Sequence, residues 1–153
     1  MNDLPKDYWA GAHPHPLAPD DDDVATYRRL ISGASSVLLL GNTPALMELC
    51  DVALDLAPFS DSPKAMQGDW TANQQQYDAI IGDGVLNFTD ELAHDVLAMA
   101  ARSCRVFVVR AFSRRLPIMR VAANFPTAEQ LTPRPDEVLE RVDYRFFVWN
   151  FCS

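Results

Sequence analysis

Apolar residues occur along this chain in short continuous runs, separated by segments with helical periodicity. The first run, Val37–Leu40, stops at Gly41, and comparable runs occupy residues 52–54, 77–81 and 105–109. Fully buried parallel strands have this continuous pattern, whereas strands with one solvent-facing side alternate apolar and polar residues. The four runs are therefore predicted to be neighbouring strands of a buried sheet.

Two segments have the periodicity of amphipathic helices. The acidic run 20–23 suits the first turn of a helix, because negative charge complements the helix dipole there. The apolar face of this helix consists of Val24, Tyr27, Leu30 and Ile31. Between the third and fourth predicted strands, Thr89 is a suitable N-cap for a helix with an apolar stripe over 92–100. This alternation predicts an α/β fold with a three-layer, doubly wound and mostly parallel sheet.

The two ends of the chain are less regular. Residues 1–19 carry four of the eleven prolines and are predicted to form an irregular arm, so that residues 20–153 form a single domain. After residue 111 the C-terminal part is short. Residues 136–142 are a candidate helix, and the aromatic segment 144–151 is a candidate final strand, antiparallel at one side of the sheet.

Composition narrows the range of partners. The 153 residues include 13 basic and 21 acidic side chains, a net charge of −8, so neither nucleic acid nor an anionic membrane is an expected partner. No run reaches the roughly 20 apolar residues of a membrane helix, and the first residues lack the features of a signal peptide. We expect a cytoplasmic protein, and a homo-oligomer is compatible with this composition. The three cysteines, Cys50, Cys104 and Cys152, are expected to be reduced and packed.

The residues that end the predicted strands are the best candidates for chemistry, because open α/β sheets bind ligands beyond the carboxyl ends of their strands. After the first strand, Pro44 suits a first helical residue and Thr43 its cap, which leaves backbone N–H groups for an anion. Asp55 ends the second strand and can accept hydrogen bonds from two ribose hydroxyls. A dinucleotide fingerprint requires three glycines and an acid about twenty residues further on. Here one glycine, Gly41, precedes Asp55 by fourteen residues, which disfavours a pyrophosphate-bearing cofactor.

Four segments resemble successive motifs of the class I S-adenosylmethionine-dependent methyltransferases. They read VLLLGNTPAL at 37–46, VALDLAP at 52–58, GDW at 68–70 and YDAIIGDGVLNF at 77–88. The resemblance is to the variant whose first motif contains Leu-Gly-x-Thr-Pro, and it spans residues 36–110, roughly half of the chain. It implies a short, divergent member of this family with a Rossmann-like fold, a reduced C-terminal part and S-adenosylmethionine as cofactor.

The resemblance also implies a role for each matching position. Gly41, Asn42 and Thr43 would line the methionine part of the cofactor. Asp55 would hold the ribose hydroxyls. Asp69 with Trp70 would address the amine and the ring face of adenine, and Asp83 would lie near the methionine amine.

Two functions follow from this resemblance. The first is an S-adenosylmethionine-dependent methyltransferase acting on an unidentified small molecule. The alternative is a catalytically inactive methyltransferase-like binding or interaction module, because Ala45 replaces a glutamate of the variant motif and the part after Arg110 is short. No side chain is assigned as a catalytic base.

Three features outside these motifs have candidate roles. The proline-rich arm with Tyr8, Trp9, His13 and His15 is hypothesised to close over the cofactor. The two histidines lack further ligands at metal-binding spacing, so no metal site is predicted. The cluster of Arg110, Arg114 and Arg115 has two interpretations, a solvated surface or an anchor for an anionic substrate group.

Overall fold

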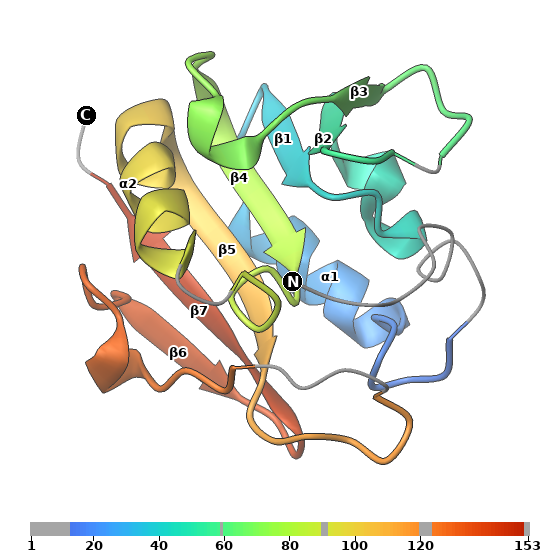
Figure 1. Ribbon diagram of the computed structural model, residues 1–153, viewed down its shortest axis with the longest axis vertical. Coiled ribbons are helices and arrows are strands. Elements are labelled where there is room, and N and C mark those ends of the chain that lie inside the picture. Colours follow the sequence, from blue (N-terminus) through green and yellow to red (C-terminus); the bar gives the residue numbers. More distant parts are fainter. Residues whose placement is uncertain (1–12, 59, 90–91, 120–123, 152–153) are drawn as a thin grey trace.

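The computed structural model describes residues 13–58, 60–89, 92–119 and 124–151, which form seven strands, two α-helices and three 3-10 helices (Figure 1). The strands are β1 (Val37–Leu40), β2 (Val52–Asp55), β3 (Ala65–Gln67), β4 (Tyr77–Asp83), β5 (Cys104–Phe112), β6 (Glu137–Glu140) and β7 (Tyr144–Asn150). The α-helices are α1 (Asp21–Leu30) and α2 (Ala93–Ser103), and the 3-10 helices are η2 (Pro44–Leu49), η3 (Trp70–Ala72) and η5 (Ala128–Gln130).

One sheet contains all seven strands in the order β3-β2-β1-β4-β5-β7-β6. Strands β1 to β5 are parallel, while β7 is antiparallel to both of its neighbours, β5 and β6. The four residues of β1 are all buried, as are the four central residues of β4. The predicted mostly parallel sheet is therefore confirmed, and so is the antiparallel strand at 144–151.

The prediction of a helix at 136–142 is wrong. Residues Glu137–Glu140 form the edge strand β6, which pairs with β7 in the register Val138 with Phe147 and Leu139 with Phe146. The Arg141 N–H donates to the Tyr144 carbonyl at 2.8 Å and closes the hairpin. Strand β7 pairs with β5 along one edge, and its other edge offers backbone groups to Glu137–Glu140, so pairing outweighs the local helix propensity here.

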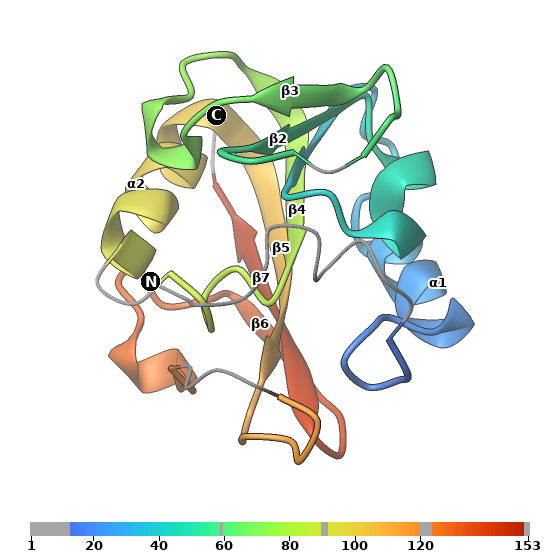
Figure 2. The same ribbon diagram turned by 45° about the vertical axis from the view of Figure 1, so that its right-hand side comes forward.

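The sheet is covered on both faces, as a three-layer fold requires. Figure 2 shows α2 on one side of the sheet and α1 with η2 on the other. Tyr27 of α1 packs with Leu39 and Val108 in one core cluster, whereas Val96 of α2 packs with Phe107 in the other. The acidic start of α1 forms a capping box, in which the backbone N–H of Asp23 donates to the Asp20 side chain at 2.8 Å.

Several local predictions differ from the structure. Thr43 makes no side-chain hydrogen bond at the start of η2, although Pro44 is its first residue. Helix α2 begins at Ala93, and the hydroxyl of Thr89 has no hydrogen-bond partner, so neither threonine is the predicted side-chain cap. At η2 the chain leaves β1 through a 3-10 turn, and before α2 the Leu92 N–H donates to the Thr89 carbonyl at 2.8 Å, so backbone bonds take the place of a side-chain cap.

The remaining predictions concern the cysteines, the chain termini and the membrane. Cys50 and Cys104 are buried free thiols, and burial raises the pKa of Cys104 to about 12. Cys152 and the arm residues Tyr8 and Trp9 lie outside the described residues. No helix in the described part of the chain has the length and apolarity to cross a membrane.

Candidate functional site

An open pocket of about 1750 Å³ lies at the carboxyl edge of the parallel strands. Its wall is built by the turns after β1, β2 and β4, by η3, by the start of α2 and the end of β5, by the irregular segment 13–19, and by segment 124–131, which contains η5. All seven residues predicted from the sequence to bind a cofactor line this one pocket: Gly41, Asn42, Thr43, Asp55, Asp69, Trp70 and Asp83. The parallel topology brings them together, because each follows or ends a strand at the same edge of the sheet.

Gly41 and Trp70 form a compact corner of the pocket. Gly41 has φ of +100°, in the left-handed region that other residues adopt only with strain, and its N–H donates to the Leu54 carbonyl at 2.8 Å. The indole Nε1 of Trp70 donates to the same carbonyl at 2.5 Å. A Cβ placed on Gly41 would lie 3.9 Å from the Trp70 ring. The indole is thus held across the end of β2, with its polar group satisfied by the protein.

Two carboxylates, those of Asp55 and Asp69, line the pocket together with Trp70. Burial raises the pKa of Asp55 above its ordinary value, while backbone N–H groups of Ala57 and Leu56 act in the opposite direction. The side chain of Leu56, the next residue, is 65% exposed and lines the pocket as an apolar surface. Asp69 accepts hydrogen bonds from the backbone N–H and the hydroxyl of Thr71, at 2.9 and 2.8 Å, and so fixes the start of η3.

Asp83, at the end of β4, forms a two-point ion pair with Arg110 of β5. The Nε and Nη2 atoms of Arg110 lie 2.6 and 3.0 Å from the two carboxylate oxygens of Asp83. The side chain of Arg110 is 0% exposed and that of Asp83 is 7% exposed. Burial raises the pKa of Asp83, although the guanidinium opposes this shift. Burial disfavours the charged Arg110, but the attraction of Asp83 prevails and holds its pKa above the ordinary value, so Arg110 remains charged.

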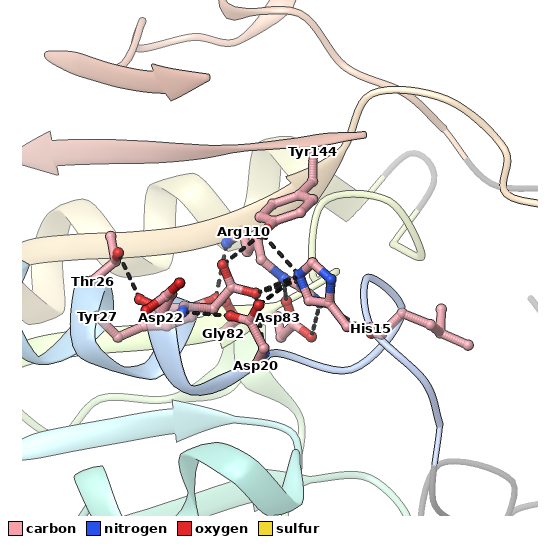
Figure 3. Close-up of polar contacts among 11 residues, drawn as sticks. His15, Asp20, Asp22, Thr26, Tyr27, Gly82, Asp83, Arg110 and Tyr144 are labelled. Atoms are coloured by element: carbon pink, nitrogen blue, oxygen red, sulfur yellow. Dashed lines mark hydrogen bonds and ion pairs between the residues drawn. The ribbon is translucent and has the colours of Figure 1, made fainter. Parts of the chain in front are cut away.

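A second buried carboxylate, Asp23 of α1, also forms an ion pair with Arg110. Figure 3 shows the surrounding side chains, with Asp83, His15 and Tyr144 close to Arg110. The Oδ2 atom of Asp23 lies 3.1 Å from Nη1 of Arg110, and its Oδ1 accepts the Tyr144 hydroxyl at 2.7 Å. The Leu17 carbonyl accepts from Nη2 of Arg110 at 3.0 Å, and His15 Nε2 lies 2.9 Å from the Tyr144 hydroxyl. The network therefore attaches the N-terminal segment to the ends of β4, β5 and β7.

This network corrects the prediction for Arg110, whereas Arg114 and Arg115 are exposed, as the interpretation of a solvated surface expects. Arg110 is neither solvated nor an anchor for an anionic substrate, because Asp83, Asp23 and the Leu17 carbonyl surround its guanidinium. Arg114 is an exposed residue in an ion pair with Asp143 at 2.6 Å.

The network also bears on metal binding. His15, Asp20 and Asp23 offer three ligand atoms within 4.8 Å of one another. Both oxygens of Asp23 already accept hydrogen bonds, from Arg110 and Tyr144, so the geometry is that of an ion-pair network.

The pocket also has an apolar wall that was not predicted from the sequence, which we call the aromatic wall: Leu17, Phe88, Phe112 and Phe125. A Cβ on Gly84 would lie 3.1 Å from the Phe88 ring and 3.6 Å from the Phe112 ring, so these two rings meet over that glycine. The segments that carry the wall are distant in sequence and lack periodicity, and no sequence signal groups them.

Buried Asn87 holds two parts of the aromatic wall together. Its side-chain amide donates to the carbonyls of Phe112 and Asn124 at 3.0 and 2.7 Å, and its Oδ1 accepts from the Phe112 N–H at 2.8 Å. The Asn124 N–H donates back to the Asn87 carbonyl at 2.9 Å. These bonds fix the segment that carries Phe125 against the end of β5.

The strand order and the strand-end pocket define the class of this protein's architecture: it has the fold of the class I S-adenosylmethionine-dependent methyltransferases, as the resemblance of its motifs predicts. The sequence itself matches no protein-family model and no curated protein.

Among solved structures, the chain is similar to magnesium protoporphyrin IX methyltransferase (ChlM) from Synechocystis PCC 6803 with bound S-adenosylmethionine. The two are 15% identical over 86% of this chain and 77% of that chain, with a TM-score of 0.57. The N-terminal domain of EvdMO1 with bound S-adenosylhomocysteine is 12% identical over 89% of this chain and 83% of its own, with a TM-score of 0.61. DhpI in complex with S-adenosylhomocysteine is 19% identical over 86% of both chains, with a TM-score of 0.56. At identities this low, the structural similarity establishes a common fold and no more.

Proposed function

We propose that this protein is an S-adenosylmethionine-dependent methyltransferase acting on a small molecule. The observation that carries the proposal is the convergence of Gly41, Asp55, Asp69 and Asp83 on one pocket at the switch region of a methyltransferase-type sheet. Among the described lining residues there are three carboxylates and neither lysine nor arginine. This charge suits a ligand with an ammonium and a sulfonium group but no phosphate.

The residues present fit such a cofactor. Asp55 presents a part-buried carboxylate for the ribose hydroxyls, and the exposed apolar side chain of Leu56 beside it suits a purine ring. Trp70 closes the same corner with its ring, and Asp69 lies next to it. Asp83 adds negative charge at the end of β4, where a contact with the ligand ammonium would supplement its bonds to Arg110. When bound, S-adenosylmethionine supplies an electrophilic methyl group.

The size of the pocket favours an enzyme over an inactive binding module. Pockets for one small molecule usually measure about 300–1,000 Å³, and this one has a volume of about 1750 Å³. It therefore has room for an acceptor beside the cofactor. Methyl transfer requires alignment of two molecules more than specialised acid–base groups, so the chain can contribute to the rate mainly by positioning them.

Isothermal titration calorimetry with S-adenosylmethionine and S-adenosylhomocysteine tests this proposal. We expect each to bind with one site per chain, because the seven residues predicted to bind the cofactor line one pocket. Absence of binding by both ligands would contradict the proposed cofactor and the enzyme function together. Binding without methyl transfer to any acceptor from a small-molecule panel would instead support the inactive module.

The pH dependence of this binding is a separate prediction. Asp55 must be ionised to accept two hydroxyl bonds, and its pKa is raised by burial. Affinity for S-adenosylhomocysteine is therefore complete above the raised pKa and falls as the pH drops through it. The fall should begin at a higher pH than for an ordinary aspartate with a pKa near 3.9. Titrations from neutral to acidic pH measure this, with Asp55→Asn as the control that binds weakly and without that pH dependence. A wild-type profile as flat as that of the variant would refute the assignment.

A further inference from the structure

None of the seven residues predicted to bind the cofactor belongs to the aromatic wall. Its residues come from the N-terminal segment, the residues after β4, the end of β5 and the segment around residue 125. Two of its members, Leu17 and Phe112, are almost fully buried and belong to the core cluster on the α1 face. The wall is thus a rigid extension of the core, and Arg110 and Asn87 hold its segments in place.

One polar side chain next to this wall has no hydrogen-bond partner among the described residues. Thr89 follows Phe88, lines the pocket and is 7% exposed, and its Oγ1 makes no hydrogen bond. An unpaired buried hydroxyl costs stability unless something satisfies it. Thr89 belongs to the pocket wall, so a molecule bound in the pocket could be this partner. The hydroxyl is buried in the structure, and a rotation about χ1 that exchanges it with the methyl group would turn it toward such a molecule.

We propose that the methyl acceptor is an uncharged aromatic molecule with one hydrogen-bonding group, bound against the aromatic wall and oriented by the hydroxyl of Thr89. The phenylalanine rings and the leucine side chain of the wall favour a ligand with a flat apolar surface. Contacts between aromatic rings add to the binding free energy gained from burial. An ionised group placed on this wall would lose its hydration against carbon atoms. The guanidinium of Arg110 does not compensate it, because it is surrounded by Asp83, Asp23 and Leu17. This inference rests on the proposed function, because it assigns the second ligand of the same pocket.

The chain offers a matched pair of variants to test the role of Thr89. Ser103, at the far end of α2, also has a buried hydroxyl without a partner, but it does not line the pocket. Thr89→Val and Ser103→Ala each remove an unpaired hydroxyl, so both variants should keep the thermal stability of the wild type. A difference between them in ligand binding therefore reports on the position of the hydroxyl and not on folding.

The experiment is calorimetry on the protein saturated with S-adenosylhomocysteine. The probes are naphthol and its charged counterparts naphthoate and naphthylmethylammonium, substituted at the same ring position. We expect naphthol to bind at least about tenfold more tightly than either charged probe. Thr89→Val should weaken naphthol binding by about five- to tenfold without changing the affinity for S-adenosylhomocysteine, and Ser103→Ala should change neither. As a single variant, Phe125→Ala should weaken naphthol binding by about five- to tenfold as well.

Several outcomes would overturn this inference. These are a charged probe that binds as tightly as naphthol, no binding of naphthol to the loaded protein, and an effect of Thr89→Val that falls on S-adenosylhomocysteine instead of naphthol. Each of them leaves the proposed cofactor intact. Failure of S-adenosylhomocysteine itself to bind contradicts the proposed function, so the two failures are distinguishable.

Discussion

Replacing Arg110 with methionine is expected to lower the free energy of unfolding by about 3–5 kcal/mol at neutral pH. The change leaves the carboxylates of Asp83 and Asp23 buried without their shared counter-ion. It also removes the bond to the Leu17 carbonyl that holds the N-terminal segment on the pocket. Urea unfolding followed by circular dichroism measures the loss.

The matched control for Arg110 is Arg114→Met. Arg114 also forms an ion pair, with Asp143, but it is 66% exposed, and such surface pairs contribute at most about 1 kcal/mol. The pH gives a second test of the reason. Burial raises the pKa of Asp83 and the guanidinium opposes this shift, so without the arginine the pKa of Asp83 should rise further. The difference in stability between variant and wild type should then shrink as the pH falls and Asp83 takes up a proton. Equal losses for both variants would show that burial does not govern this ion pair.

The second large effect is expected for Asp55→Ala, which should weaken the binding of S-adenosylhomocysteine by about 100-fold or more. Two hydrogen bonds to a charged group, each contributing about 1.5–3 kcal/mol, correspond to that loss. Stability should change little, because Asp55 lies at the open end of β2 in the pocket wall and burial disfavours its charge. Calorimetry at neutral pH measures the affinity, and thermal unfolding checks that the variant is folded.

Asp61→Ala is the control for Asp55. Asp61 is an exposed carboxylate on the same connection between β2 and β3, outside the pocket. We expect it to bind S-adenosylhomocysteine like the wild type, which separates a local contact from the general loss of one negative charge. If Asp55→Ala stayed within about threefold of the wild-type affinity, the ribose assignment would be wrong.

Much of the sheet could be predicted because its signals are local. The continuous apolar runs of β1 and β4 identify buried strands, and Gly41 and Asp83 mark where they end. By contrast, nothing local distinguishes β6 from a short helix, since its conformation depends on backbone pairing with β7. The apolar run before Arg110 predicts that this residue lies near a strand end. Its burial depends on two acids from other elements, Asp23 of α1 and Asp83 of β4, which the sequence does not place beside it.

The sequence by itself determined the α/β class and the order of the motifs at the strand ends, and its resemblance to the methyltransferases identified seven residues that share the pocket. They share it because the carboxyl ends of parallel strands lie at the same edge of the sheet. Only the tertiary structure decided what surrounds them. The aromatic wall, the ion pair of Asp83 with Arg110 and the unpaired hydroxyl of Thr89 each arise where segments distant in sequence meet. Whether a side chain is buried and whether its hydrogen bonds are satisfied depend on contacts between distant segments, so both are decided only when the chain has folded.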